Sequence, residues 1–163
     1  MTRRFTAFLI AVGVFALDRW SKWLVENSFG AWDTKTVIPG FFNIIHSENP
    51  GVAFGMFAAN TSHSRTLLLA AMSIAAILIL AVMLWKIDRQ DHLTATGLAL
   101  IFGGAIGNVY DRVRAGSVTD FLDFYAGSYH WYTFNVADTA ICIGAGLLIL
   151  SMLSSNRKKE ANA

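Results

Sequence analysis

Residues 66–85 read TLLLAAMSIAAILILAVMLW, a run without a charged side chain between Arg65 and Lys86. The hydrocarbon core of a bilayer is about 30 Å thick, and a helix rising about 1.5 Å per residue needs roughly 20 apolar residues to cross it. This run has the required length. It predicts a transmembrane helix, and therefore a membrane protein.

Two more charge-free runs of similar length follow, at 93–110 and 139–156. Near the start of the chain, residues 5–17 are also apolar, but Asp18 and Lys22 follow before the apolar pattern resumes. We expect an all-α polytopic membrane protein with a small extracytoplasmic β element and an amphipathic surface segment. As a single domain over residues 1–163, it would have four transmembrane helices, at about 5–25, 65–85, 93–112 and 138–155, and outer loops at 26–64 and 113–137.

The composition supports a membrane environment and excludes other classes. Of 163 residues, 15% are charged, against about 25% in an ordinary soluble domain. The hydrophobic share is 55% and the mean hydropathy is +0.47, which excludes a disordered chain. A net charge of +2 is too small to drive binding to nucleic acid, so we expect no such partner. The single cysteine excludes a disulfide within the chain.

The first apolar run has the features of either a signal peptide or a retained helix. Arg3 and Arg4 give it the positive start of a signal peptide, but no small-x-small cleavage site follows. We therefore expect an uncleaved helix.

Lys and Arg near the ends of the spans are retained on the cytoplasmic side of a membrane. Seven of them predict that both termini and the turn at 86–92 are cytoplasmic: Arg3, Arg4, Lys86, Arg89, Arg157, Lys158 and Lys159.

The first outer loop contains signs of two short strands. Residues 36–38 and 41–45 have strand-like composition, and Pro39-Gly40 between them favours a turn. Residues 52–59 are apolar enough to lie on the membrane surface. This small sheet could be a passive cap on the helices or could contact a substrate, and the sequence leaves both open.

Polar residues at the ends of the spans carry most of the functional information. A charge at the centre of a bilayer costs about 2.5–3.5 kcal/mol on insertion scales, so such residues mark a site or a structural pair. Structural interpretations exist for each: Asp18 and Lys22 are spaced as an i,i+4 ion pair, and Asp138 could be a helix N-cap. Glycines at 103, 104 and 107 are typical of close helix packing. Four carboxylates nevertheless gather at one end of the last two spans: Asp111, Asp120, Asp123 and Asp138.

The residue types present favour carboxylate chemistry. There is no Gly-x-Ser-x-Gly motif, Cys142 lies within an apolar run, and the four histidines are scattered without metal-binding spacing. We therefore expect no metal and no cofactor. Two carboxylates about 4 Å apart repel by about 4 kcal/mol at an effective dielectric of 20, so one of them keeps its proton. A pair of this kind can supply the acid and the base of an aspartic peptidase. The spacing alone does not choose the pair.

Five segments, taken in order, resemble a known family. They are Asp18-x-x-x-Lys22, residues 49–54 (NPGVAF), residues 103–112 (GGAIGNVYDR), residues 118–121 (VTDF) and residues 134–138 (FNVAD). Together with four predicted spans and cytoplasmic termini, this set is similar to bacterial lipoprotein signal peptidase, also called signal peptidase II. The resemblance extends over nearly the whole chain.

The resemblance implies an intramembrane aspartic endopeptidase of the bacterial inner membrane, with its active site near the outer face. Its substrates would be prolipoproteins, cut before a cysteine that already carries diacylglycerol, and membrane lipids would surround it. We expect a monomer. The family motifs assign the catalytic pair to Asp120 and Asp138. They assign substrate-binding or supporting roles to Asn49, Asn108, Arg112, Asn135, Asp111, Asp18 and Lys22.

Two other classes of protein compete with this interpretation. A small proton-coupled transporter or channel subunit would use Asp18, Asp111 and Asp138 as a relay near the bilayer midplane. The acids instead cluster toward the outer ends of the spans. A non-catalytic membrane scaffold would tolerate amides in place of both Asp120 and Asp138.

Overall fold

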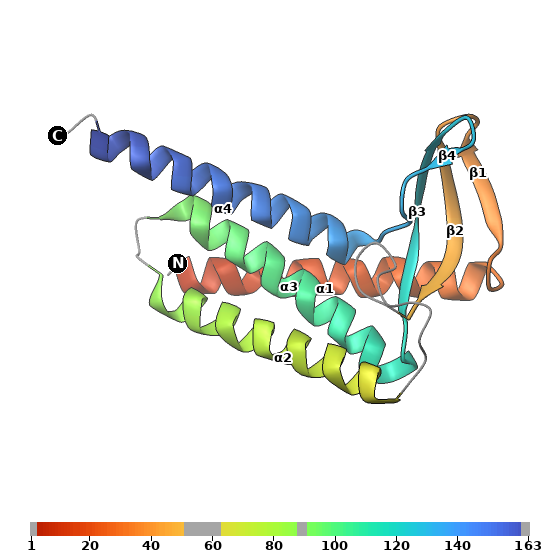
Figure 1. Cartoon of the computed structure of the whole chain (residues 1–163), viewed down its shortest axis with the longest axis horizontal. Helices are drawn as coiled ribbons and strands as arrows, with labels where there is room; N and C mark the ends of the chain where they lie inside the picture. Colours follow the sequence, from red (N-terminus) through yellow and green to blue (C-terminus); the bar gives the residue numbers. More distant parts are fainter. Residues whose placement is uncertain (1–2, 51–62, 88–90, 161–163) are drawn as a thin grey trace.

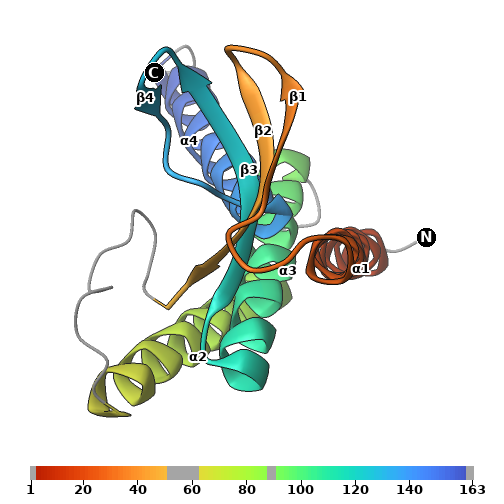
Figure 2. The same cartoon turned by 90° about the vertical axis from the view of Figure 1, so that its right-hand side faces the viewer.

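The computed structural model describes residues 3–50, 63–87 and 91–160. In these ranges, helices lie side by side, an antiparallel sheet lies at one end of them, and the N and C termini lie at the other end (Figure 1). Figure 2 looks onto the sheet end, with the strands in front of the helices. The elements are α1 (Arg3–Ser28), β1 (Thr34–Ile38), β2 (Phe42–Asn49), α2 (His63–Lys86), α3 (His92–Ala115), β3 (Val118–Ala126), β4 (Tyr129–His130) and α4 (Val136–Glu160).

Helix α3 is the centre of the helical layer and contacts α1, α2 and α4. Glycines make the close contacts possible. A Cβ on Gly104 would lie 2.5 Å from the backbone oxygen of Ala137 in α4, and one on Gly107 would lie 2.6 Å from Oδ2 of Asp18 in α1. No side chain fits at such distances. The prediction that these glycines serve close helix packing is therefore confirmed.

The distribution of side chains is opposite to that of a soluble protein. The apolar residues that are buried are mostly small, such as Ala95 and Ala99, whereas several buried positions are charged or polar. Large apolar side chains point outward from the helices, among them Leu78 and Ile79 of α2 and Met152 of α4. Exposure of so much apolar surface would be unfavourable in water, but it is not unfavourable in contact with lipid tails.

Two helices in the described ranges are long and apolar enough to cross a membrane: His92–Ala115, and Val136–Ser154 within α4. Helix α2 contributes a shorter apolar segment, Ala71–Lys86. Helix α1 has the length of a span but carries Asp18 and Lys22 in its C-terminal half. The four-span arrangement thus remains a prediction, since only two helices meet the criteria of length and composition.

The sheet has the strand order β1-β2-β3-β4. The two strands expected in the first outer loop are present as β1 and β2, joined at Pro39-Gly40. The segment 113–137, expected as the second outer loop, contains β3 and β4, for which the sequence analysis above gave no strands, and β3 pairs with β2. This pairing sets Ser47 opposite Asp120. The segment 52–59, expected on the membrane surface, lies outside the described residues.

Candidate active site

A buried ion cluster joins α1 to α3. Nζ of Lys22 lies 2.8 Å from Oδ2 of Asp18 and 2.7 Å from Oδ2 of Asp111, and it donates to Oδ1 of Asn108 at 3.2 Å. Asp18 and Lys22 are both 0% exposed, so the predicted i,i+4 pair is confirmed. Asp111 also pairs with Arg19. Two carboxylates therefore face two cations, which is the arrangement that buried charges require.

The cluster extends to the first turn of α4 through two hydrogen bonds. Asn108 accepts from Lys22 with its side-chain oxygen and donates from Nδ2 to Oδ1 of Asp138 at 2.8 Å. Oδ1 of Asp18 accepts from the backbone N–H of Ala137 at 2.9 Å. The position of the Asp138 carboxylate is thus fixed relative to α1 and α3.

Asn135 connects Asp138 to Asp120. Its side-chain oxygen accepts from the backbone N–H of Asp138 at 2.9 Å, and its Nδ2 donates to Oδ1 of Asp120 at 2.7 Å. The side chain is 0% exposed. Because Asn135 caps α4, the suggestion that Asp138 is the N-cap was wrong. Asp138 lies three residues further on, and its carboxylate is available to Asn108.

Asp120 lies on β3 and is 2% exposed. Its Oδ2 accepts from Nδ2 of Asn49 at 3.0 Å. Burial, and after it the negative charge of Asp138, raises the pKa of Asp120 to about 7, against the opposing effects of hydrogen bonds from Asn49 and Asn135 and of the Lys22 charge. A large fraction of Asp120 therefore holds a proton at neutral pH, beside a second carboxyl group on a different element.

Arg112 brings a positive charge to the same place. Its guanidinium donates to the backbone oxygen of Asn108 at 3.1 Å, and the side chain is half-buried. Its charge interacts with those of Asp138, Asp120 and Asp111. All the site residues predicted from the sequence are thus brought into one connected network.

Three residues that were not predicted from the sequence as site residues also support this network: Arg19, Glu26 and Thr119. Arg19 pairs with Asp111 and lies 3.6 Å from Glu26, and Oγ1 of Thr119 donates to Glu26 at 2.9 Å. Thr119 immediately precedes Asp120. A signal was present: positions 19, 22 and 26 fall on one face of a helix, so three charges in succession face the bundle.

Asp123 belongs to a separate polar group. It lies three positions after Asp120 on β3, and an odd spacing places two side chains on opposite faces of a sheet. Its carboxylate accepts from Asn43 at 2.9 Å and lies 2.8 Å from Nδ1 of His130. Among the residues that the structure describes, no cluster of His, Cys, Asp and Glu has the arrangement of a metal site.

Comparison with known proteins identifies the family. Residues 10–154 match the model of signal peptidase (SPase) II. The chain belongs to the signal peptidase II family. The match covers both acids, Asp120 and Asp138, and the helices and strands that position them.

Relatives that carry the family's name match the chain over nearly its full length. The lipoprotein signal peptidase of Solibacter usitatus is 52% identical over 155 residues, which are 95% of this chain and 94% of that protein. That of Geobacter sulfurreducens is 42% identical over 92% of each chain. Two solved structures, each described as a bacterial membrane enzyme, are also similar. The first has a TM-score of 0.85 and 30% sequence identity, and the match covers 94% of this chain and 91% of the other. The second has a TM-score of 0.80 and 32% sequence identity, and the match covers 91% of this chain and 92% of the other.

Family membership makes the chain a membrane protein and a protease. It does not favour the transporter or channel interpretation, because the match to the family covers residues 10–154, including the segments that hold the acids. A non-catalytic scaffold is likewise not favoured.

Proposed function

We propose that this member of the signal peptidase II family is an aspartic endopeptidase that removes signal peptides from prolipoproteins, with Asp120 and Asp138 as its catalytic pair. The cut would fall before the cysteine that carries diacylglycerol. The observation that carries the proposal is the bridge made by Asn135, which binds Asp120 with its nitrogen and the backbone of Asp138 with its oxygen.

The environments of the two acids suggest a division of roles. Asp120 is the more buried, and its pKa of about 7 suits a group that donates a proton. The Asp138 carboxylate takes a proton from the attacking water, the resulting hydroxide adds to the scissile carbonyl, and Asp120 protonates the carbonyl oxygen. Proton transfer from Asp138 to the departing amine then breaks the C–N bond, while the Asp120 carboxylate takes a proton back from a hydroxyl of the intermediate, so that a carboxylic acid is released and both acids return to their starting states. Asn108 and Asn135 hold the two acids in place, and Asn49 binds the acid on β3.

We further propose that the protein lies in the bacterial inner membrane with both termini in the cytoplasm and the sheet at the outer face. Basic residues gather at the end that carries the termini, which is the cytoplasmic signature. The acids lie at the opposite end, beside the sheet, where an emerging signal peptide would present its cleavage site. Lipid chains of the substrate would stay in the bilayer. We also propose that residues 1–163 form a single domain and that the protein is a monomer.

Purified protein tests this function directly. In detergent, it should cut a prolipoprotein that carries diacylglycerol on its cysteine, and mass spectrometry should place the cut before that cysteine. The same precursor without the lipid should be a poor substrate. Equal turnover of both forms would contradict recognition of the lipid, and cleavage of neither would contradict the proposed activity.

The pH dependence of cleavage should report on Asp120. As the pH rises through about 7, Asp120 loses the proton that it must donate, so kcat/KM should fall by about tenfold for each pH unit well above that value. Initial rates between pH 5 and 9 would measure this. The Asp123→Asn variant should show the same decline, because Asp123 belongs to the other polar group. A rate that is constant up to pH 9 would remove the role of Asp120 as the acid.

Replacement of Arg112 by Ala should weaken substrate binding. Its charged hydrogen bonds to a substrate backbone or headgroup would be worth about 1.5–3 kcal/mol, so KM should rise at least about tenfold. Arg114→Ala is the matched control, since Arg114 is on the same helix but exposed, with a 3.5 Å ion pair to Glu26. An unchanged KM in a folded Arg112→Ala variant would assign Arg112 a structural role only.

A further inference from the structure

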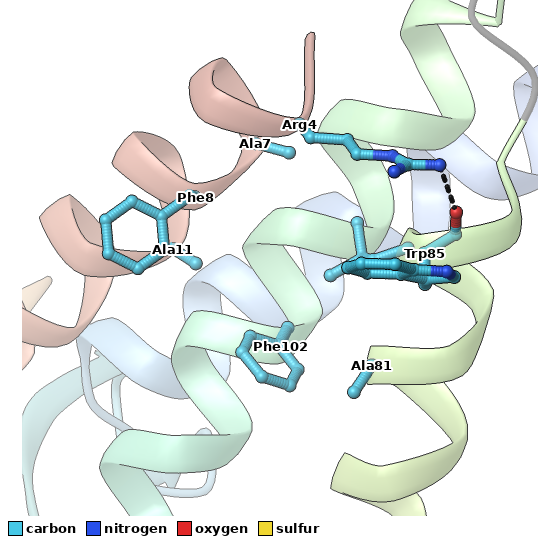
Figure 3. Close-up of a pocket in the computed structure, with 8 residues that line it drawn as sticks. Arg4, Ala7, Phe8, Ala11, Ala81, Trp85 and Phe102 are labelled. Carbon is cyan, nitrogen blue, oxygen red and sulfur yellow. Dashed lines mark hydrogen bonds between the residues drawn. The ribbon is translucent and has the colours of Figure 1, made fainter. Parts of the chain in front are cut away.

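An apolar groove lies where the first turns of α1 meet the last turns of α2 (Figure 3), and this is the end of the molecule that carries the termini (Figure 1). It has a volume of about 310 Å³ and lies between α1, α2 and α3. This volume is at the lower end of the range for ligand pockets. The walls are apolar apart from one cation, and they include Arg4, Ala7, Phe8, Ala81, Trp85 and Phe102.

Arg4 is held at one end of this groove by two contacts with Trp85. Its guanidinium donates to the backbone oxygen of Trp85 at 2.9 Å and lies over the indole ring, 4.7 Å from the centroid. The hydrogen bond uses one of five N–H donors, and among the described residues the guanidinium makes no other hydrogen bond. No carboxylate lines the groove in the part of the chain that the structure describes.

In a membrane protein, apolar walls with a basic residue at one end favour a lipid as the ligand. Apolar walls between helices that face the bilayer are filled by acyl chains, because no other apolar material is abundant there. Arg and Trp together at one end are typical of the level of the headgroups. Basic pockets between transmembrane helices bind the phosphates of anionic lipids.

We propose that the groove binds one anionic phospholipid, with an acyl chain between α1 and α2 and its phosphate at Arg4. Charge decides between this occupant and a signal peptide. The N-terminal region of a signal peptide is basic and would be repelled by Arg4, whereas a phosphate is attracted. The site is independent of the catalytic proposal, since Asn49, Asn108 and Asn135, whose side chains hydrogen-bond to the carboxylates of Asp120 and Asp138, do not line the groove.

Quenching of Trp85 fluorescence by phospholipids with brominated acyl chains tests the site in the intact protein. The other four tryptophans, at 20, 23, 32 and 131, belong to the outer half of α1 and the loops near the sheet, so subtraction of the Trp85→Phe spectrum isolates Trp85. Vesicles should contain either brominated phosphatidylglycerol or brominated phosphatidylcholine. The anionic lipid should bind about fivefold more tightly, the contribution of one basic residue near an anionic surface.

Three variants separate a built site from general attraction to a charged surface. Arg4→Gln should remove the preference for phosphatidylglycerol. Lys86→Gln, an exposed cation at the same end that is not part of the groove, should keep it. Ala81→Leu should also remove the preference, because the larger side chain occupies the groove while both cations remain. Unchanged circular dichroism and cleavage activity would verify that each variant folds.

Several outcomes would overturn the proposal. Equal quenching of the native protein by both lipids would show that the groove has no preference. Equal losses in Arg4→Gln and Lys86→Gln would show attraction to the surface alone, and an unaffected Ala81→Leu variant would place the lipid outside the groove. Displacement of the brominated lipid by a lipid-modified precursor would instead assign the groove to the signal peptide.

Discussion

Replacement of Asp120 or Asp138 by Asn is expected to lower the rate of cleavage of a lipid-modified precursor by about 10²–10⁴-fold, the usual contribution of a single acid or base. Asn has the shape of Asp but can neither take nor give the proton. In Asp138→Asn the hydrogen bond from Asn108 is retained, because the amide oxygen can still accept it. The loss would therefore come from chemistry rather than from the position of the side chain.

A matched control is available on the same strand. Asp123 is 5% exposed, close to the 2% of Asp120, and its carboxylate also accepts a hydrogen bond from an Asn side chain. Asp123→Asn thus tests what the loss of a buried carboxylate on β3 does to folding alone, and its cleavage rate should stay within a few-fold of the native rate. Thermal unfolding in detergent would show that all three variants are folded.

The double variant sharpens the test. If Asp120 and Asp138 act as one unit, removal of both should slow cleavage no more than removal of one, because groups that act together are not additive. Kinetics with excess enzyme would measure the residual rates. Native activity in either single variant would contradict the catalytic pair, and multiplied losses in the double variant would show that the two acids act separately.

The sequence predicted the helices well because the bilayer imposes a length on them. The charge-free run 93–110 lies within α3, and 139–156 lies within α4. The strand β3 was missed for a physical reason. Its sequence VTDFLDFYA contains two Asp, which are depleted in strands, and its partner β2 is about 70–80 residues earlier in the chain. Strand pairing between segments so far apart in the chain produces no pattern in the sequence next to either strand.

The site was predictable in part. Acids at the ends of spans indicated where it lies, and only the family resemblance chose Asp120 and Asp138 over Asp111 and Asp123. The structure gives the physical basis for setting Asp123 apart, since alternation along β3 turns it to the other face. The ion pair of Arg19 with Asp111 was not predictable, because it joins residues from different helices.

Replacement of Lys22 by Met is expected to destabilise the protein by about 3–5 kcal/mol, the usual effect of breaking a buried ion pair from one side. Met matches the length of Lys but carries no charge. Lys22 is fully buried, and its Nζ lies within 2.8 Å of carboxylate oxygens of both Asp18 and Asp111. Its loss leaves Asp18 charged and buried without a counter-ion. Asp111 keeps Arg19.

Chemical unfolding in detergent would measure this loss, with Lys35→Met as the control. Lys35 lies on β1 and is exposed, so the same substitution there should change the free energy of unfolding by less than about 0.5 kcal/mol. If Lys22→Met has no folded population while Lys35→Met folds normally, the result would also agree with the expected loss of stability. A Lys22→Met variant as stable as the native protein would contradict the role of the cluster.

A second substitution separates the charge of Lys22 from its packing. Asp18→Asn in the Lys22→Met background removes the unpaired carboxylate but keeps an oxygen that can accept from the backbone N–H of Ala137. The double variant should therefore recover more than half of the lost stability, since an uncharged pair avoids the cost of a lone buried charge. No recovery would mean that Lys22 acts by filling space. Recovered stability without recovered cleavage would show that its bond to Asn108, the residue that holds Asp138, is needed to position that acid.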